Sequence, residues 1–338
     1  MSRKHHSRKH KKNDRILKII AVILAIVIVV CGILYAISLW ENHMGSYDEP
    51  ATTDMASQII DFNGIKYALN EDIETVLVMG LDKFERSDED SYSNDMQADF
   101  LMLLVIDNAK EECTALHINR DTVAQMSILG VAGDRIDTVS QQLALAYTYG
   151  NGKEISCRNT AEAVSDLLLD VEIDHYVSVT MNSVAKYNDL VGGVKVKVMD
   201  DFSGIDDTLV LGKEVVLKGE HALNYVRSRY GLDDSTNNRR MERQRQYIEA
   251  LYQKTVECLD ADDDFIVDSA SKISEDLVSD CSANRLQSIA EKIADYKFAG
   301  IRYIDGETVM GDDYLEFHPE AESIKETVVE LFYIQKTE

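Results

Sequence analysis

One long apolar stretch stands out in the hydrophobic pattern, near the start of the chain. Ile19–Trp40 holds 22 residues and no charged side chain. At about 1.5 Å rise per residue, such a helix spans a hydrocarbon core about 30 Å thick. It is longer than the apolar core of a cleaved signal peptide and ends in an interfacial tryptophan rather than a cleavage site. The pattern therefore predicts a transmembrane signal anchor over residues 19–40.

Farther along, short apolar runs of strand length alternate with amphipathic stretches of helix length. Phe100–Ile106 is apolar on both faces, which predicts a central strand, and Val194–Val198 alternates like a half-buried one. This order predicts an α/β fold, with a mixed central β-sheet layered with helices after one N-terminal transmembrane helix. Further strands are expected at 75–80, 113–119, 174–180, 215–217 and as a pair within 301–317, and helices at 138–149, 159–170, 182–191, 219–226, 240–258, 266–278, 283–296 and 319–332.

Charge predicts how the anchor is oriented. Residues 1–18 carry eight Lys and Arg against one Asp, a local charge of +7, in a chain whose net charge is −25. Positively charged flanks stay in the cytoplasm, so residues 41–338 should lie outside the cell membrane. Subtracting +7 from −25 leaves −32 on this exported part. So acidic a surface excludes nucleic acid as a partner.

These patterns divide the chain into five parts. They are a basic cytoplasmic tail (1–18), the signal anchor (19–40), a juxtamembrane connector (41–70), an extracytoplasmic domain (71–258) and a C-terminal helical and strand extension packed on that domain (259–338). A turn is predicted at Asn63-Gly64, inside the connector. The sequence assigns no role to the C-terminal extension.

An arginine-rich stretch, Tyr225–Gln246, runs against this acidic background. Arginine presents a planar fork of donors that binds phosphate through two hydrogen bonds, whereas lysine is a point charge. The alternative is a solvated helix balanced by nearby carboxylates. The stretch holds Arg227, Arg229, Arg239, Arg240, Arg243 and Arg245, and no lysine. In a helix, one face would hold Arg240, Arg243, Gln244 and Tyr247, with Arg239 and Arg245 pointing elsewhere.

Acidic residues gather where predicted strands end or begin. Asp82 follows the first strand, Asp99 precedes the central one, and Arg120-Asp121 follows the next. Ligands of open α/β sheets bind at such an edge, and paired carboxylates suit Mg²⁺ together with phosphate oxygens. Each Asp taken alone is more readily explained as a cap or turn residue. Together they predict a phosphate and metal site.

Several other chemistries lack their motifs. No Gly-rich phosphate loop, GxSxG or HExxH occurs, which disfavours nucleotide cofactors, serine hydrolases and zinc proteases. The sequence contains no CxxC spacing, so it does not indicate a zinc site. The four exported cysteines fit two disulfides or four free thiols equally well: Cys113, Cys157, Cys258 and Cys281.

A series of short motifs in order resembles the LytR-CpsA-Psr family of cell-wall glycopolymer ligases. The resemblance covers about residues 74–256. Two positions depart from the family pattern: Gln97 stands where Arg is frequent, and Asn119 replaces the usual Pro, which we expect to loosen the turn before Arg120. The motifs are Gly80-Leu-Asp82, Gln97-Ala-Asp99, Ile118-Asn-Arg-Asp-Thr122, Ile173-Asp-His-Tyr-Val177, Leu190-Val-Gly-Gly-Val194, Gly219-Glu-His-Ala-Leu223, Val226-Arg-Ser-Arg229 and Arg240-Met-Glu-Arg-Gln244.

The resemblance implies a phosphotransferase acting outside the membrane. Family members move a glycopolymer, with its attaching phosphate, from a polyprenyl pyrophosphate to a peptidoglycan hydroxyl. They hold the isoprenoid tail in an apolar tunnel and use Mg²⁺, with Mn²⁺ as a possible substitute. Carried over, Asp82 and Asp99 are metal ligands or bases, and Asp121 orients Arg120 or contacts the metal shell. The implied catalytic set is Asp82, Asp99, Arg120 and Asp121, and the implied pyrophosphate ligands are Arg120, Arg227, Arg229, Arg240, Arg243 and Gln244.

Three other functions remain open from the sequence. Water could replace the acceptor, which would make the protein a polyprenyl-pyrophosphate pyrophosphatase. The same arginines could serve a non-catalytic lipid receptor. A transcriptional regulator is opposed by the outside topology and the acidic exported part.

Overall fold

The fold is seen in a computed structural model that describes most of the chain from residue 59 on. The predicted tail and anchor lie outside the described residues, and so does Arg229. No helix within the described part is long and apolar enough to cross a membrane. The described residues are 59–83, 94–228, 237–261, 272–282, 285, 288–289, 292–293, 295–311 and 314–336.

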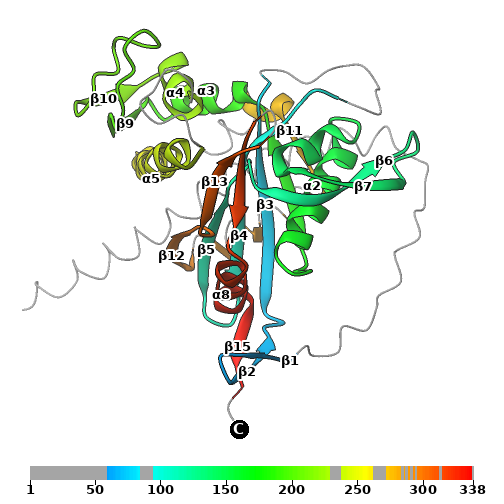
Figure 1. Cartoon of the computed structure of the whole chain (residues 1–338). Coiled ribbons are helices and arrows are strands. Elements are labelled where there is room, and N and C mark those ends of the chain that lie inside the picture. Colours follow the sequence, from blue (N-terminus) through cyan, green and yellow to red (C-terminus); the bar gives the residue numbers. More distant parts are fainter. Residues whose placement is uncertain are drawn as a thin grey trace, which may run out of the picture.

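A six-stranded mixed sheet forms the centre of the fold (Figure 1), as predicted. Its middle strands β3, β4 and β5 run antiparallel in turn, while β8 pairs parallel with β3 and β12 parallel with β5. Most of β4 is buried, which confirms the predicted central strand. In spatial order the strands are β11 (Leu277–Ser279), β8 (His175–Val179), β3 (Ile73–Leu81), β4 (Ala98–Asp107), β5 (Glu112–Ile118) and β12 (Lys297–Arg302).

Each face of the sheet packs against its own hydrophobic core. Because successive side chains of a strand point to opposite faces, Val76 enters one core and Leu77 the other. The first core is covered by α3 (Met181–Leu190), α4 (Glu220–Arg227), α5 (Asn237–Ala261) and the pair β9 (Val194–Lys197) and β10 (Glu214–Leu217). The second is covered by α2 (Glu154–Leu167), the 3₁₀ helix η1 (Leu143–Thr148) and α8 (Ala321–Phe332).

One predicted helix is divided between a strand and a short 3₁₀ helix. Over 138–149 the structure has the end of β7 (Arg135–Gln142), followed by η1. β7 pairs antiparallel with β6 (Val123–Leu129), which the sequence pattern did not indicate. The β-branched Thr138 and Val139 favour the strand, while the apolar run after Gln142 forms the short helix.

The end of the predicted connector is also structured. β1 (Ile59–Phe62) and β2 (Ile65–Leu69) form a hairpin around the predicted turn. Asn63 and Gly64 both have positive φ, 55° and 78°, as a two-residue hairpin turn requires. The last strand, β15 (Tyr333–Gln335), pairs with β2, so both ends of the described chain meet in one small sheet.

The C-terminal segment is part of the central sheet. It supplies both edge strands, β11 and β12. A helix had been expected over 266–278: its residues 266–271 lie outside the described residues, and the part from 274 on is η2 (Ser274–Asp276) and β11. The predicted strand pair appears as the hairpin β13 (Gly306–Met310) and β14 (Leu315–Pro319).

Candidate active site

The candidate site lies at one end of the central sheet. Since β4 runs against β3 and β5, the end of β3, the start of β4 and the end of β5 meet there. Asp82 therefore follows β3, Asp99 stands near the start of β4, and Arg120 follows β5. The structure brings these three residues to one place, as the sequence predicts.

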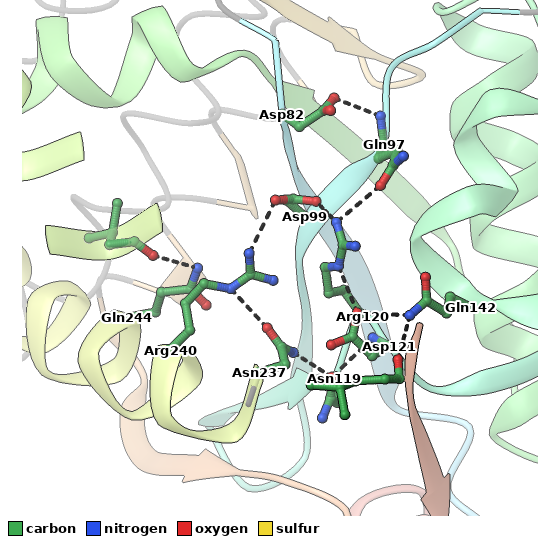
Figure 2. A network of polar contacts seen from close by, with 12 residues as sticks. Asp82, Gln97, Asp99, Asn119, Arg120, Asp121, Gln142, Asn237, Arg240 and Gln244 are labelled. Atoms are coloured by element: carbon green, nitrogen blue, oxygen red, sulfur yellow. Dashed lines mark hydrogen bonds and ion pairs between the residues drawn. The ribbon is translucent and has the colours of Figure 1, made fainter. Parts of the chain in front are cut away.

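Asp99 is held between two arginines (Figure 2). One carboxylate oxygen, Oδ1, accepts from Nη1 of Arg120, and the other, Oδ2, lies 3.2 Å from Nη1 of Arg240. The two arginines are only 8% and 4% exposed. Gln97, the departure noted above, also accepts from Arg120 at 3.1 Å. Two cations from separate elements thus converge on one anion.

Asp82 borders the same region but has a different partner. Its Oδ1 accepts a 2.7 Å hydrogen bond from the backbone N–H of Gln97. Among the described residues, no arginine forms a salt bridge with it. Asp82 is therefore the carboxylate of the site that keeps the most capacity for a further ligand or a proton.

Two hollows meet at this point. An apolar cavity of about 240 Å³ lies between β3–β4 and helices α3, α4 and α5. Its walls include Met102, Leu104, Tyr187, Leu223, Ile248 and Leu251. A polar hollow of about 500 Å³ includes Asp82, Gln97 and Arg120. Both are bordered by Asp99, Met181, Arg227 and Arg240.

Helix α5 presents only part of its predicted face to the hollows. Arg240, Gln244 and Tyr247 line the apolar cavity. Arg243 does not: it is 0% exposed, with Nη1 2.5 Å from Asp200 Oδ2 and Nε donating to Tyr225 O at 3.0 Å. At about 100° per residue, Arg243 lies about 60° to one side of Arg240. The pyrophosphate contact expected for Arg243 has no support in this geometry.

The remaining arginines of the stretch divide as expected. Arg239 pairs with Asp200 and Glu242, and Arg245 lies 5.0 Å from the ring centroid of Tyr303, so neither borders the hollows. Arg227 borders both hollows. Gln244 donates to Val226 O at 3.1 Å, which ties α5 to α4.

The turn at Asn119 corrects another expectation. Far from loosening it, the side chain closes the turn: Asn119 Oδ1 accepts the N–H of Asp121 at 3.0 Å, and the Asn119 carbonyl accepts the N–H of Thr122 at 3.1 Å. An asparagine side chain can thus supply the local bonding that stabilises a tight turn. Arg120 is fixed in place by it.

His117, on β5, was not predicted from the sequence. It is 1% exposed and packs against the Phe100 ring. Burial, together with the charges of Arg245 and Arg240, lowers the pKa of His117 to about 3. A polar residue in an otherwise apolar strand was the only available signal. The buried His117 side chain is therefore neutral and lies close to the arginines of the site.

The donor set fits a divalent cation bound together with phosphate. Mg²⁺ takes one or two carboxylates and completes its shell with phosphate oxygens and waters. Asp82 and Asp99 both border the polar hollow, and a carboxylate keeps lone pairs after accepting from arginine. The one cluster of three metal-type ligands among the described residues, His175, Asp280 and Cys281, lies away from both hollows. Cys113, Cys157, Cys258 and Cys281 are all free thiols.

Comparison with known proteins points to one family. The LytR_cpsA_psr family model matches residues 38–331, well beyond residue 256 where the sequence motifs end. Polyisoprenyl-teichoic acid–peptidoglycan teichoic acid transferase TagU of Halalkalibacterium halodurans is 28% identical over 225 residues. That match covers 66% of this chain and 66% of the relative, slightly under two thirds of its length.

Solved structures share the fold. Bacillus subtilis TagV superimposes with a TM-score of 0.56 at 24% identity, covering 76% of this chain and 96% of that one. A TagT structure with LIIa-WTA bound gives a TM-score of 0.56 at 21% identity, covering 78% and 90%. The mixed sheet with its helical layers is thus the fold of these proteins.

Proposed function

This chain belongs to the LytR_cpsA_psr family, and from that premise we propose that it transfers a glycopolymer to peptidoglycan. The donor would be a polyprenyl pyrophosphate carrying the glycopolymer, and the acceptor a peptidoglycan hydroxyl. The names of relatives such as TagU support glycopolymer transfer in cell-wall assembly. The polyprenyl carrier is implied by the family resemblance, and the character of the two hollows supports it.

One observation carries the proposal: an apolar cavity opens into an arginine-lined polar hollow. A polyprenyl pyrophosphate has the same two-part character, a hydrocarbon tail joined to a dianionic or more highly charged head. The four residues common to both hollows include Arg227 and Arg240, which lie where tail would meet head. Bidentate guanidinium groups suit the pyrophosphate.

The reaction would be a displacement at phosphorus. The acceptor hydroxyl oxygen attacks the phosphorus that bears the glycopolymer, the bond to the bridging oxygen breaks, and polyprenyl phosphate leaves. Arg120, Arg227 and Arg240 would hold the phosphate oxygens and balance their developing charge. Asp82, which has no arginine partner among the described residues, would take the hydroxyl proton.

A metal ion fits the same arrangement. Asp82 and Asp99 would hold Mg²⁺ or Mn²⁺ beside the pyrophosphate. When bound, the ion would neutralise charge on the phosphate oxygens. Asp99 meanwhile keeps Arg120 and Arg240 aimed at the hollow.

The proposed setting is the outer face of the cell membrane. The predicted anchor would keep the domain beside its lipid donor at a high effective concentration. A reporter enzyme that works only outside the cytoplasm should be active when it is fused to the C-terminus. A cytoplasmic C-terminus would overturn the setting and favour the regulator alternative.

Release of polyprenyl phosphate tests the reaction. The full chain in detergent would receive a short glycan-linked polyprenyl pyrophosphate and Mg²⁺, with and without peptidoglycan oligomers. We expect release that needs both the metal and the acceptor and falls at least about a hundredfold in Arg120→Ala. Lys254→Ala, which alters an exposed pair with Glu257 on α5, is the matched control.

Other outcomes identify the alternatives. Release without acceptor would make the protein a pyrophosphatase. Tight lipid binding with no release under any condition would make it a receptor.

A further inference from the structure

We infer that Asn119 and Asn237 form an amide bridge that positions Arg120 and Arg240 for phosphate. The inference rests on the proposed function for its substrate, but the bridge itself is read from side-chain contacts. Both asparagines are buried, at 6% and 2% exposed, and they are 118 residues apart in the chain. Neither would touch substrate, so both are positioning residues.

The bridge joins the end of β5 to the start of α5. Asn119 Oδ1 accepts from Asn237 Nδ2, and Asn237 Oδ1 accepts from Arg240 Nε at 2.8 Å. On the other side, Asn119 Oδ1 also accepts the N–H of Asp121 at 3.0 Å. Asp121 in turn accepts from Arg120 Nε at 2.9 Å.

These bonds close a ring around the site (Figure 2). Arg120 and Arg240 both reach Asp99, so each arginine is fixed twice, through Nε to the ring and through Nη1 to Asp99. We call this closed set the polar ring. Its six members, in order, are Asn119, Asn237, Arg240, Asp99, Arg120 and Asp121.

The ring admits one orientation of each amide. Turning Asn119 over would set its NH₂ group against two other N–H groups, and turning Asn237 over would set its NH₂ against Arg240 Nε–H. Each guanidinium therefore has one preferred direction. Donors fixed before substrate arrives need no reorganisation during the reaction.

Asn119 supplies the side-chain amide on which this arrangement depends. The family pattern usually has Pro there, which has no side-chain amide and could not accept from Asn237. The ring also includes the acidic residue, Asp121, to which the resemblance assigned an orienting role toward Arg120. The geometry points to Asn119 and Asn237 as further residues with that role.

A double-mutant cycle tests the bridge. Asn119→Ala and Asn237→Ala would each be measured for kcat/KM in the release reaction, and for Kd of inorganic pyrophosphate by calorimetry. In each single variant we expect kcat/KM to fall about tenfold and Kd for pyrophosphate to rise about tenfold. Because both substitutions break the same bridge, the double variant should be no more impaired than the more impaired of the two single variants.

Two further variants separate positioning from folding. Asn119→Asp keeps an oxygen for Asp121 N–H and Asn237, so it should recover most of the loss while Asn119→Ala does not. Asn238→Ala removes the 2.9 Å bond from Asn119 Nδ2 and a long 3.5 Å bond to Thr308 Oγ1, both of an exposed side chain outside the ring, and should stay within about twofold of wild type. Thermal midpoints of all variants would be compared with wild type.

The outcomes are distinct. Fully additive losses, or losses that follow the thermal midpoints alone, would overturn the bridge. If wild type releases no polyprenyl phosphate but its pyrophosphate affinity still falls non-additively in the variants, the proposed function fails and the bridge stands. If wild type neither turns over nor binds pyrophosphate, both are overturned.

Discussion

Asp99 is the residue on which the charges of the site depend. It is paired with Arg120 and Arg240, which come from different elements. Both arginines are largely buried, so neither is well solvated and each needs a counter-charge. Asp99 thus stabilises the fold in addition to any contact with metal or substrate.

Asp99→Asn keeps the side-chain shape and removes the charge. We expect the free energy of unfolding to fall by about 3 kcal/mol, because two buried guanidinium groups lose their shared partner. Urea unfolding of the full chain in detergent measures it. Asp95→Asn, which breaks the exposed Lys83–Asp95 pair, should leave stability nearly unchanged. Equal effects from the two variants would contradict the assignment.

His117 predicts an acid sensitivity of known direction. Its folded pKa, about 3, lies below the ordinary value of 6.5. Between these values the unfolded chain binds a proton that the folded chain does not, so stability falls as pH drops from 6.5 toward 3. The slope from this one group is at most about 1.4 kcal/mol per pH unit.

His117→Gln should flatten that slope. Unfolding free energies of wild type and variant between pH 7 and 4.5 would give the difference. Val216→Ala, at an exposed position that carries no ionisable group, is the control and should leave the slope as in wild type. Parallel curves for wild type and His117→Gln would refute the prediction.

At this scale the sequence predicts positions better than orientations. Asp82, Asp99 and Arg120 could be predicted because strand ends of a sheet share an edge. The orientation of Arg243 could not be predicted, because a small rotation around the helix separates residues that face the cavity from residues that bind other parts of the chain. The role of Asn119 could not be predicted either, because it depends on a hydrogen bond from Asn237, which lies 118 residues away in the sequence.

At the scale of elements, α5 and the C-terminal hairpin hold the site from two sides. α5 supplies Arg240 and Asn237. On the other side, β14 accepts a 2.6 Å bond from Gln142 at Leu315 O and donates from Phe317 N to Asp121 O at 2.8 Å. The segment after residue 261 therefore supports Asp121 as well as the sheet edges.

A chain ending at Ala261 should not fold cooperatively. It would leave β5 and β8 without their partners β12 and β11, and unpaired strand edges favour aggregation. Thermal unfolding followed by circular dichroism would show no sharp transition. A cooperative transition in the shortened chain would show that residues 262–338 are a separable extension.

Elements with strong periodicity could be predicted, and those stabilised by pairing could not. Helices α2, α3 and α8 and the apolar strands β3, β4 and β5 lie close to their expected positions. β7, β11 and β15 are short or polar, and partners elsewhere in the chain stabilise them. β6 has the length of a strand, but its apolar residues do not alternate regularly.

For the whole molecule, the two joined hollows predict that tail and head can be separated experimentally. Ile248→Trp would fill part of the apolar cavity and leave the polar hollow unchanged. Binding of polyprenyl phosphate should weaken by about tenfold or more, because the tail loses space, while binding of inorganic pyrophosphate stays within about twofold.

Val216→Trp is the control for this prediction. Val216 is 55% exposed and lines neither hollow, so both ligands should bind as in wild type. Equal weakening of both ligands by Ile248→Trp would mean that the cavity is not where the tail binds.

The small sheet of β1, β2 and β15 stands at the opposite end of the domain from the site. β3 starts beside it and runs nine residues, about 30 Å, before Asp82 follows at the other end. The first and last described strands therefore meet about one strand length away from the proposed catalytic carboxylates. A surface attachment made at this sheet would leave both hollows clear, so immobilising the domain there should preserve turnover.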